Sequence, residues 1–129
     1  MRRVVVTGIG TVSALGNSTA EFWSRIAAGK SGIGPITRCD VSELRFKNAA
    51  EVKDFDPKEH FDDKTLTWID LFCQYGMVAA REAVADSGIE FTPDLRENTG
   101  VITGSCLGGK VAEDEGFRLL YQGHRSHQP

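Results

Sequence analysis

The sequence predicts an α/β fold with a mostly parallel or mixed sheet and helices on both of its faces. Two short runs of apolar, β-branched residues, at 3–7 and 99–103, each lead into a glycine turn, at 8–10 and 104–109. Helical patterns separate the two runs. Apolar runs of this length that alternate with helices are typical of strands buried on both faces of a sheet. The glycines allow another part of the molecule to approach the backbone closely.

Length and charge limit the class of protein. The 129 residues carry a net charge of -3, with acidic and basic residues interspersed. A chain of this length can form one core that buries about two-thirds of the unfolded chain's surface. The sequence has no polybasic stripe, which argues against nucleic-acid binding. No apolar run is long enough for a membrane span or a signal peptide, so the sequence predicts a cytoplasmic protein.

The first helix is predicted between residues 18 and 29. Ser18 and Glu21 have the S-x-x-E spacing of a capping box, and Gly29 is a suitable C-terminal cap. A surface stretch over residues 31–57 follows, with a short strand expected at 49–52. A stretch of this length usually packs against another element or has a function of its own.

The longest helix is predicted over residues 64–87, ending at Gly88. Six apolar side chains recur at steps of three and four, so they share one face, and we interpret it as a core helix. They are Leu66, Ile69, Cys73, Met77, Ala80 and Val84. Glycine and alanine in its second half permit close approach to a sheet or to another helix. A last helix is predicted over residues 109–122, with acidic residues in its first turns, where the helix dipole favours negative charge.

Cysteines and histidines give no sign of a metal centre. The cysteines are odd in number and far apart, which favours reduced thiols over disulfides. The histidines form no cluster beyond a pair near the C-terminus, which we interpret as solvated, and no further ligand completes a zinc site there. These residues are Cys39, Cys73, Cys106, His60, His124 and His127.

Both glycine turns come close to nucleotide-binding motifs. The first, at residues 8–13, departs from the dinucleotide fingerprint G-x-G-x-x-G because its third glycine is Ser13, and no acid follows about 20 residues on. The second fits G-x-x-x-x-G-K over residues 104–110, but Val111 replaces the Ser or Thr that binds magnesium in a P-loop. We interpret Lys110 as a solvated helix residue. A nucleotide-binding module remains an alternative from another functional class.

Cys106 is a candidate nucleophile, because amide donors in a strand-to-helix turn can stabilise a thiolate. A cysteine nucleophile also needs a base such as histidine, and nothing in the sequence selects one of the three. We prefer to interpret Cys106 as a small buried side chain at a crowded turn.

Five short motifs, in this order, resemble the N-terminal part of the β-ketoacyl-[acyl-carrier-protein] synthases. They lie at residues 3–10 (RVVVTGIG), 28–33 (AGKSGI), 51–57 (EVKDFDP), 70–75 (DLFCQY) and 104–109 (GSCLGG). The resemblance covers residues 1–129. It implies an incomplete N-terminal part of the first thiolase-like half, within the layered αβαβα fold of these condensing enzymes.

The resemblance implies a decarboxylative Claisen condensation in fatty acid or polyketide biosynthesis. It implies acyl groups carried on the phosphopantetheine of acyl carrier protein, with no other cofactor and no metal. In the family the nucleophilic cysteine, in a Thr-Ala-Cys context, and two histidines lie further along the chain. No catalytic residue is therefore expected here, and the 129-residue chain alone is expected to be inactive.

In the family the residue aligned with Leu107 lines the acyl pocket, where its bulk limits chain length, and the turn lies close to a homodimer interface. An ordinary core leucine is the open alternative for Leu107. A non-catalytic partner subunit of the chain-length-factor type, which keeps these motifs but lacks the cysteine, is the open alternative for the function.

In related enzymes an Arg-Lys pair helps to dock the acidic carrier protein. The pair lies just before a Met-Asp that aligns with Ile69-Asp70 of this chain. Here Thr67 and Trp68 occupy those positions, and only Lys64 remains nearby. The docking surface is therefore left open. Trp68 is expected to be partly exposed, which suits a protein contact.

Overall fold

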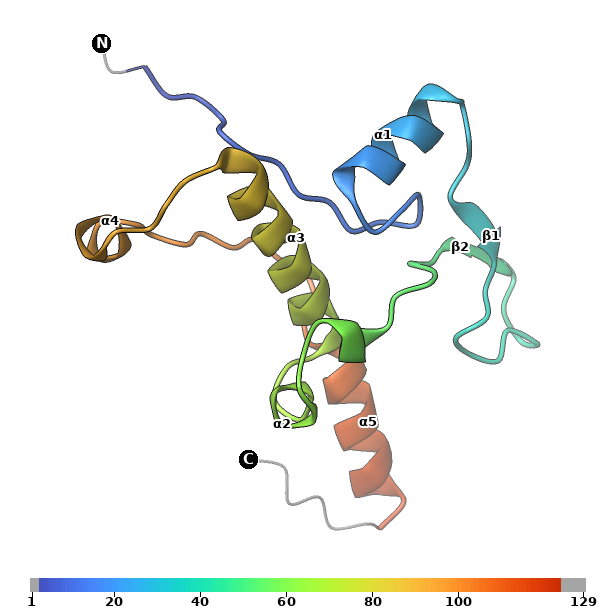
Figure 1. Cartoon of the computed structure of the whole chain (residues 1–129). Coiled ribbons are helices and arrows are strands. Elements are labelled where there is room, and N and C mark those ends of the chain that lie inside the picture. Colours follow the sequence, from blue (N-terminus) through green and yellow to red (C-terminus); the bar gives the residue numbers. More distant parts are fainter. Residues whose placement is uncertain (1–2, 124–129) are drawn as a thin grey trace.

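The computed structural model describes residues 3–123, and helix α3 forms its long axis. Helix α1 and the two strands lie on one side of α3, α4 lies on the other side, and α5 extends beyond the N-terminal end of α3 (Figure 1). The elements are α1 (Thr19–Ala27), β1 (Ile33–Pro35), β2 (Asn48–Ala50), the 3-10 helix η1 (Pro57–Glu59), α2 (Asp63–Leu66), α3 (Leu71–Ser87), α4 (Pro93–Glu97) and α5 (Lys110–Tyr121).

Helix α1 has both of its predicted caps. The Ser18 hydroxyl accepts a hydrogen bond from the Glu21 amide, at 3.3 Å. The Glu21 carboxylate accepts from the Asn17 amide, one residue earlier than in a standard capping box. At the other end Gly29 has a φ of 67°, and the amides of Gly29 and Lys30 donate to carbonyls of the last turn. This is a Schellman motif, which requires a left-handed residue where the sequence has glycine.

The predicted helix over residues 64–87 is two helices, α2 and α3, so that prediction is wrong for residues 67–70, which separate them. The short helix α2 ends at Leu66, and α3 begins after Asp70, whose carboxylate accepts from the Leu71 amide. The Gln74 side chain donates to the Ile69 carbonyl, at 3.1 Å, and fixes the link before α3. The end of α3 is confirmed, because Gly88 has a φ of 63° and caps it.

The two predicted strands at residues 3–7 and 99–103 are extended but form no strand. Val4 is 93% exposed and Ile102 is 98% exposed. A strand needs a neighbouring strand for its hydrogen bonds, and the residues described between 3 and 123 provide none for these runs. The mostly parallel sheet predicted from the sequence is therefore absent from the described chain.

The one sheet formed within the described residues is the antiparallel pair β1–β2, which aligns Ile33 with Ala50. The predicted strand at 49–52 is confirmed in position but lies one residue earlier and is shorter. Just after β2, the Glu51 carboxylate accepts hydrogen bonds from the hydroxyl and the amide of Thr37, at 2.8 and 3.1 Å. These hydrogen bonds, led by the Thr37 hydroxyl, hold the pKa of Glu51 below its usual value.

Helix α5 confirms the predicted helix at 109–122, whereas α4 was not predicted. Pro93 occupies the first turn of α4, and the Thr92 hydroxyl accepts from the Leu95 amide, at 3.2 Å. Proline is favourable at this position because its missing amide would have no helical partner. Of the helices described between residues 3 and 123, none is long and apolar enough to cross a membrane.

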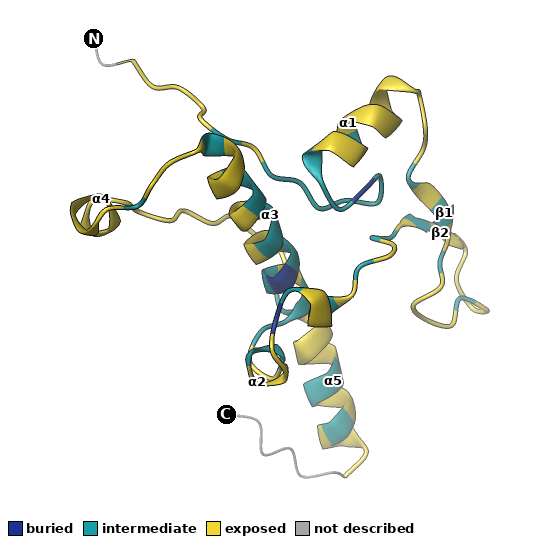
Figure 2. Cartoon of the chain, viewed as in Figure 1, coloured by how far each residue is buried: buried dark blue, intermediate teal, exposed yellow. Residues whose placement is uncertain are grey.

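The core is small. Among the described residues, only Gly16, Phe61 and Gln74 are buried, and Figure 2 shows most of the ribbon as intermediate or exposed. Phe61 lies against α3, with the Arg81 guanidinium 4.8 Å from the centre of its ring. Apolar side chains of α1, α3 and α5 stay uncovered. Residues 3–123 therefore form only part of the layers that would complete an α/β core.

Candidate functional site

The site suggested by the sequence lies where the 104–109 turn meets the start of α3. The Phe72 ring packs directly on Gly108, since a Cβ built on that glycine would lie 2.6 Å from Phe72 Cε2. The next residue, Gly109, has a φ of 84° and is the N-terminal cap of α5. A side chain would be excluded by space at Gly108 and strained by conformation at Gly109. These two glycines thus seat the turn on α3.

Leu107 lies in this turn and is 66% exposed. It is therefore not a core leucine within the described chain. Its role in an acyl pocket stays a prediction.

Cys106 is exposed, which corrects our interpretation of it as a buried side chain. The turn is crowded at Gly108, two residues later, and not at the cysteine. Cys39 and Cys106 are exposed free thiols, and Cys73, on α3, is a half-buried one.

His60 follows η1, and its ring stacks on Phe55 with the ring centres 5.2 Å apart. Its backbone carbonyl accepts from Arg81, at 2.9 Å. These contacts place His60 in an aromatic cluster on α3. No hydrogen bond among the described residues links it to Cys106, and His124 and His127 lie outside those residues. Within residues 3–123, no three potential metal-ligating side chains gather.

The first glycine turn packs on α3. A Cβ on Gly8 would lie 2.0 Å from the Ala83 carbonyl oxygen, and one on Gly10 would lie 1.8 Å from that of Ala79. The thin second half of α3 thus permits the close approach predicted from its glycine and alanine content. The glycines of the apparent dinucleotide motif serve this helix packing.

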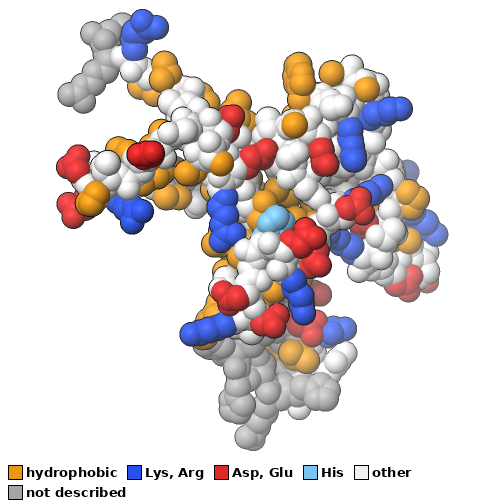
Figure 3. All heavy atoms as spheres, viewed as in Figure 1, with side chains coloured by type: hydrophobic (Ala, Val, Ile, Leu, Met, Phe, Trp, Pro, Cys, Tyr) orange, Lys and Arg blue, Asp and Glu red, His pale blue; other side chains and the backbone are white. Residues whose placement is uncertain are grey.

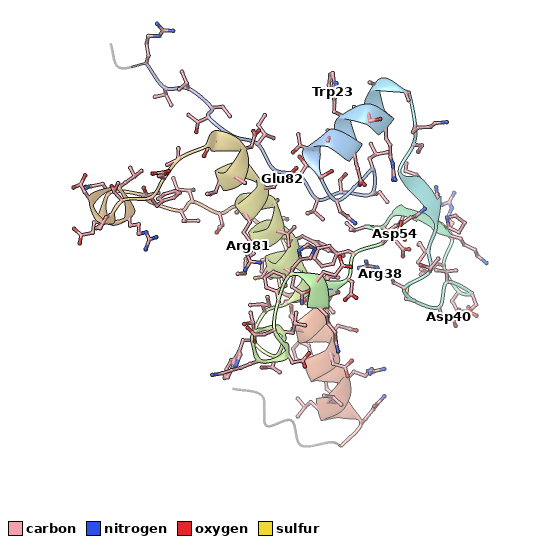
Figure 4. The ribbon with its side chains drawn as sticks, in the orientation of Figure 1. Trp23, Arg38, Asp40, Asp54, Arg81 and Glu82 are labelled. Carbon is pink, nitrogen blue, oxygen red and sulfur yellow. The ribbon has the colours of Figure 1, made fainter. Side chains whose placement is uncertain are left out.

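Carboxylates of α3 hold the same segment. Glu82 accepts hydrogen bonds from the amides of Thr11 and Thr19, each at 2.8 Å, and Figure 4 shows it on the side of α3 that faces α1. Asp86 accepts from the Ile9 amide, at 2.9 Å. One side chain, Glu82, therefore joins α3 to both the N-terminal segment and the first turn of α1.

Lys110 does not behave as a phosphate-binding lysine. Its ammonium pairs with the Glu113 carboxylate one turn further along α5, and the side chain is more than half exposed. This confirms the interpretation of Lys110 as a solvated helix residue.

An open groove of about 750 Å³ lies between the α2–α3 link and the first turns of α5. Gln74, only 8% exposed, is one of its lining residues, and its buried Oε1 atom has no hydrogen-bond partner within the described chain. Trp68 also lines it and is 68% exposed, as the sequence predicted. The other lining residues are Leu66, Thr67, Ile69, Asp70, Leu71, Val111, Ala112 and Glu115.

The charge distribution carries no single sign. On the face drawn in Figure 3, acidic and basic side chains alternate over the helices, with hydrophobic side chains between them. Lys64, which is exposed, is the one basic residue on the short helix α2.

Sequence reasoning missed the role of Asp70, whose carboxylate also accepts from the Ala112 amide in the first turn of α5, at 3.3 Å. A signal for it was present. Gly109 begins α5 without a side chain, so a cap for that helix has to come from elsewhere in the fold.

The chain matches the family model "Beta-ketoacyl synthase, N-terminal domain" over residues 1–128. It therefore belongs to the β-ketoacyl synthase family, which confirms the resemblance. Family membership implies a thiolase-like α/β fold, of which the described residues form the helices and a two-stranded sheet.

Among curated relatives, the chain is 43% identical over 129 residues to 3-oxoacyl-[acyl-carrier-protein] synthase 2 of Coxiella burnetii. It is 37% identical over 123 residues to the protein of the same name from Synechocystis. The two alignments cover 99% and 95% of this chain, and 31% and 30% of the relatives. The chain thus spans about a third of the length of these relatives.

A solved structure, that of the ishigamide ketosynthase/chain length factor, is similar to this chain with a TM-score of 0.58 and 37% sequence identity. The match covers 73% of this chain and 23% of that one. The matched part of this chain therefore has the same fold as part of that structure.

Proposed function

We propose that this chain is the N-terminal part of a 3-oxoacyl-[acyl-carrier-protein] synthase, acting in fatty acid or polyketide biosynthesis. The observation that carries the proposal is the 43% identity to a synthase of that name over 129 residues. Residues 1–129 would form part of the first thiolase-like half.

The reaction is a decarboxylative Claisen condensation in two transfers. An acyl group passes from the phosphopantetheine thiol of a carrier protein to an enzyme cysteine. A malonyl thioester then loses carbon dioxide, and the resulting enolate attacks the acyl-enzyme carbonyl, which releases the cysteine thiolate and forms the 3-oxoacyl thioester. Covalent catalysis divides one difficult step into two easier ones, and oxyanion donors assist both.

The nucleophilic cysteine and the histidines belong, in this proposal, to sequence beyond these 129 residues. This chain supplies scaffold and a wall of the acyl pocket. Helix α3 is the platform on which both glycine turns rest, and the second turn presents Leu107. No metal is required, and the phosphopantetheine comes with the substrate.

This proposal implies two partners, acyl carrier protein and a second copy of the enzyme. It also implies a location in the cytoplasm. The mixed charge in Figure 3 and the lone Lys64 on α2 support no strongly basic docking surface on this face. The exposed Trp68 is the more suitable protein contact.

A non-catalytic partner subunit is the second candidate function. The similarity to the ishigamide ketosynthase/chain length factor supports considering it, because that name includes a chain length factor beside a ketosynthase. Such a subunit would share the helices and glycine turns of this chain and would lack the catalytic cysteine.

Turnover by the full-length protein tests both candidates. With acyl- and malonyl-carrier protein we expect 3-oxoacyl product and an acylated cysteine, whereas a partner subunit would form product only with a separate ketosynthase added. No product under either condition would contradict the proposal. The 129-residue chain alone should form no 3-oxoacyl product. If it did form product, and Cys106→Ser abolished that activity, the assignment of Cys106 as non-catalytic would be overturned.

A further inference from the structure

Helix α5 begins without a capping side chain of its own. Its N-terminal cap is Gly109, and the first amides of a helix have no partner within the helix. The Ala112 amide, in the first turn, receives its hydrogen-bond acceptor from Asp70 Oδ2, at 3.3 Å, across 42 residues of sequence. The cap of α5 is thus provided by another helix.

The same carboxylate caps α3 through its other oxygen, which accepts from the Leu71 amide. This double role needs the break between α2 and α3. In a continuous helix over residues 64–87, Asp70 would occupy a helical interior position and could not cap α3. The Gln74 side chain keeps the break in place by donating to the Ile69 carbonyl.

The turn that carries Leu107 is held from two sides at this point. Phe72, on the first turn of α3, packs on Gly108, and Asp70 Oδ2 would lie 4.0 Å from a Cβ on Gly109. Residues 108–112 are therefore fixed to the start of α3 by one apolar contact and one hydrogen bond. Leu107 directly precedes this clamped segment.

We propose that Asp70 is a positioning residue that holds the 104–109 turn and the first turn of α5 against α3, and thereby sets the position of Leu107. Its effect on acyl-chain selectivity rests on the proposed function. Its hold on α5 does not.

Asp70→Asn in the full-length protein separates the two roles of the carboxylate. Asparagine caps a helix about as well as aspartate, so α3 keeps its cap. Its amide nitrogen cannot accept from the Ala112 amide, so the hydrogen bond to α5 is lost. Asp62→Asn is the matched control, because Asp62 caps only the short helix α2, through the Thr65 amide at 2.8 Å.

Hydrogen exchange and acyl-chain profile are the two measurements. We expect Asp70→Asn to accelerate hydrogen exchange of the Ala112 amide about fivefold, because one hydrogen bond is lost. We also expect it to shift the ratio of kcat/KM between long and short acyl donors several-fold. Asp62→Asn should change neither. If Asp70→Asn folds poorly, Asp70→Ser replaces it, since serine also caps α3 and is too short to reach α5.

Unchanged exchange at Ala112 would overturn the hold on α5. Faster exchange with an unchanged acyl-chain profile would overturn the effect on Leu107. If the unsubstituted protein forms no 3-oxoacyl product, the proposed function fails, and the exchange rate of Ala112 still decides the hold by Asp70.

Discussion

Gly10 decides how closely the N-terminal segment lies on α3. We expect Gly10→Ala to destabilise the protein by about 1–3 kcal/mol, the usual cost of overpacking. The reason is that the new Cβ would lie 1.8 Å from the Ala79 carbonyl oxygen, and helix backbone cannot yield easily. Chemical denaturation of the full-length protein measures the loss in the free energy of unfolding. Gly100→Ala, where a Cβ meets nothing within 4 Å, is the control, and equal stabilities of the two variants would refute the close approach.

Leu107 is the residue through which this chain would act on substrate. If it walls the acyl pocket, Leu107→Phe should shorten the longest acyl chain that the full-length enzyme accepts, because a packed pocket has little free volume for the ring. Product chain lengths measure the effect. The exposed Leu120, on α5, gives a matched Leu120→Phe control. A normally folded Leu107→Phe variant with an unchanged product profile would remove Leu107 from the pocket.

At the scale of elements, the β1–β2 pair depends on a carboxylate. Glu51 accepts hydrogen bonds from Thr37 across the loop, and these bonds, that of the Thr37 hydroxyl first, hold the pKa of Glu51 below its usual value. A lowered pKa means that the carboxylate form stabilises the fold. This contribution is fully present above the unfolded pKa and is lost as the pH falls through the folded pKa.

Acidification through the lowered pKa of Glu51 should therefore loosen this loop. We expect the Thr37 amide to exchange faster below that pKa than at neutral pH, after correction for the intrinsic pH dependence of exchange. Glu51→Gln should already show the faster exchange at neutral pH. A Glu51→Gln variant whose Thr37 amide is as protected at neutral pH as in the unsubstituted protein would contradict the assignment.

The same scale shows why helices were predicted better than strands. Ser18 and Gly29 bound α1, and Gly88 ends α3, because each cap acts on amides or carbonyls within a few residues. The break before α3 was not predictable in this way. It depends on Asp70, whose second partner lies in α5, far along the sequence.

At the scale of the whole molecule, uncovered apolar surface dominates the behaviour of the chain. Valines of residues 4–6 and the apolar residues at 101–102 are exposed in extended backbone, which is a template for pairing with another strand. Unpaired extended runs and uncovered apolar helix faces are therefore both present within the described residues.

The isolated chain should therefore associate, be partly molten, or bind the remainder of its enzyme. Size-exclusion chromatography with light scattering and a thermal melt test this expectation. Adding the rest of the proposed synthase as a separate polypeptide should suppress the association by pairing the exposed runs. A monodisperse monomer with one sharp transition would count against the proposed place of this chain in a larger fold.

The sequence by itself determined the family, both ends of α1, the C-terminal end of α3 and the places where backbone must come close, because motifs, caps and glycines act locally. It also predicted that Trp68 and Lys110 are exposed. Only the tertiary structure decided that Gly8 and Gly10 pack on the backbone of α3, that Cys106 is exposed, and that Asp70 joins two helices. The physical reason is that each of these depends on a partner distant in sequence. The runs at 3–7 and 99–103 stay unpaired for the same reason, since a strand exists only with its neighbour.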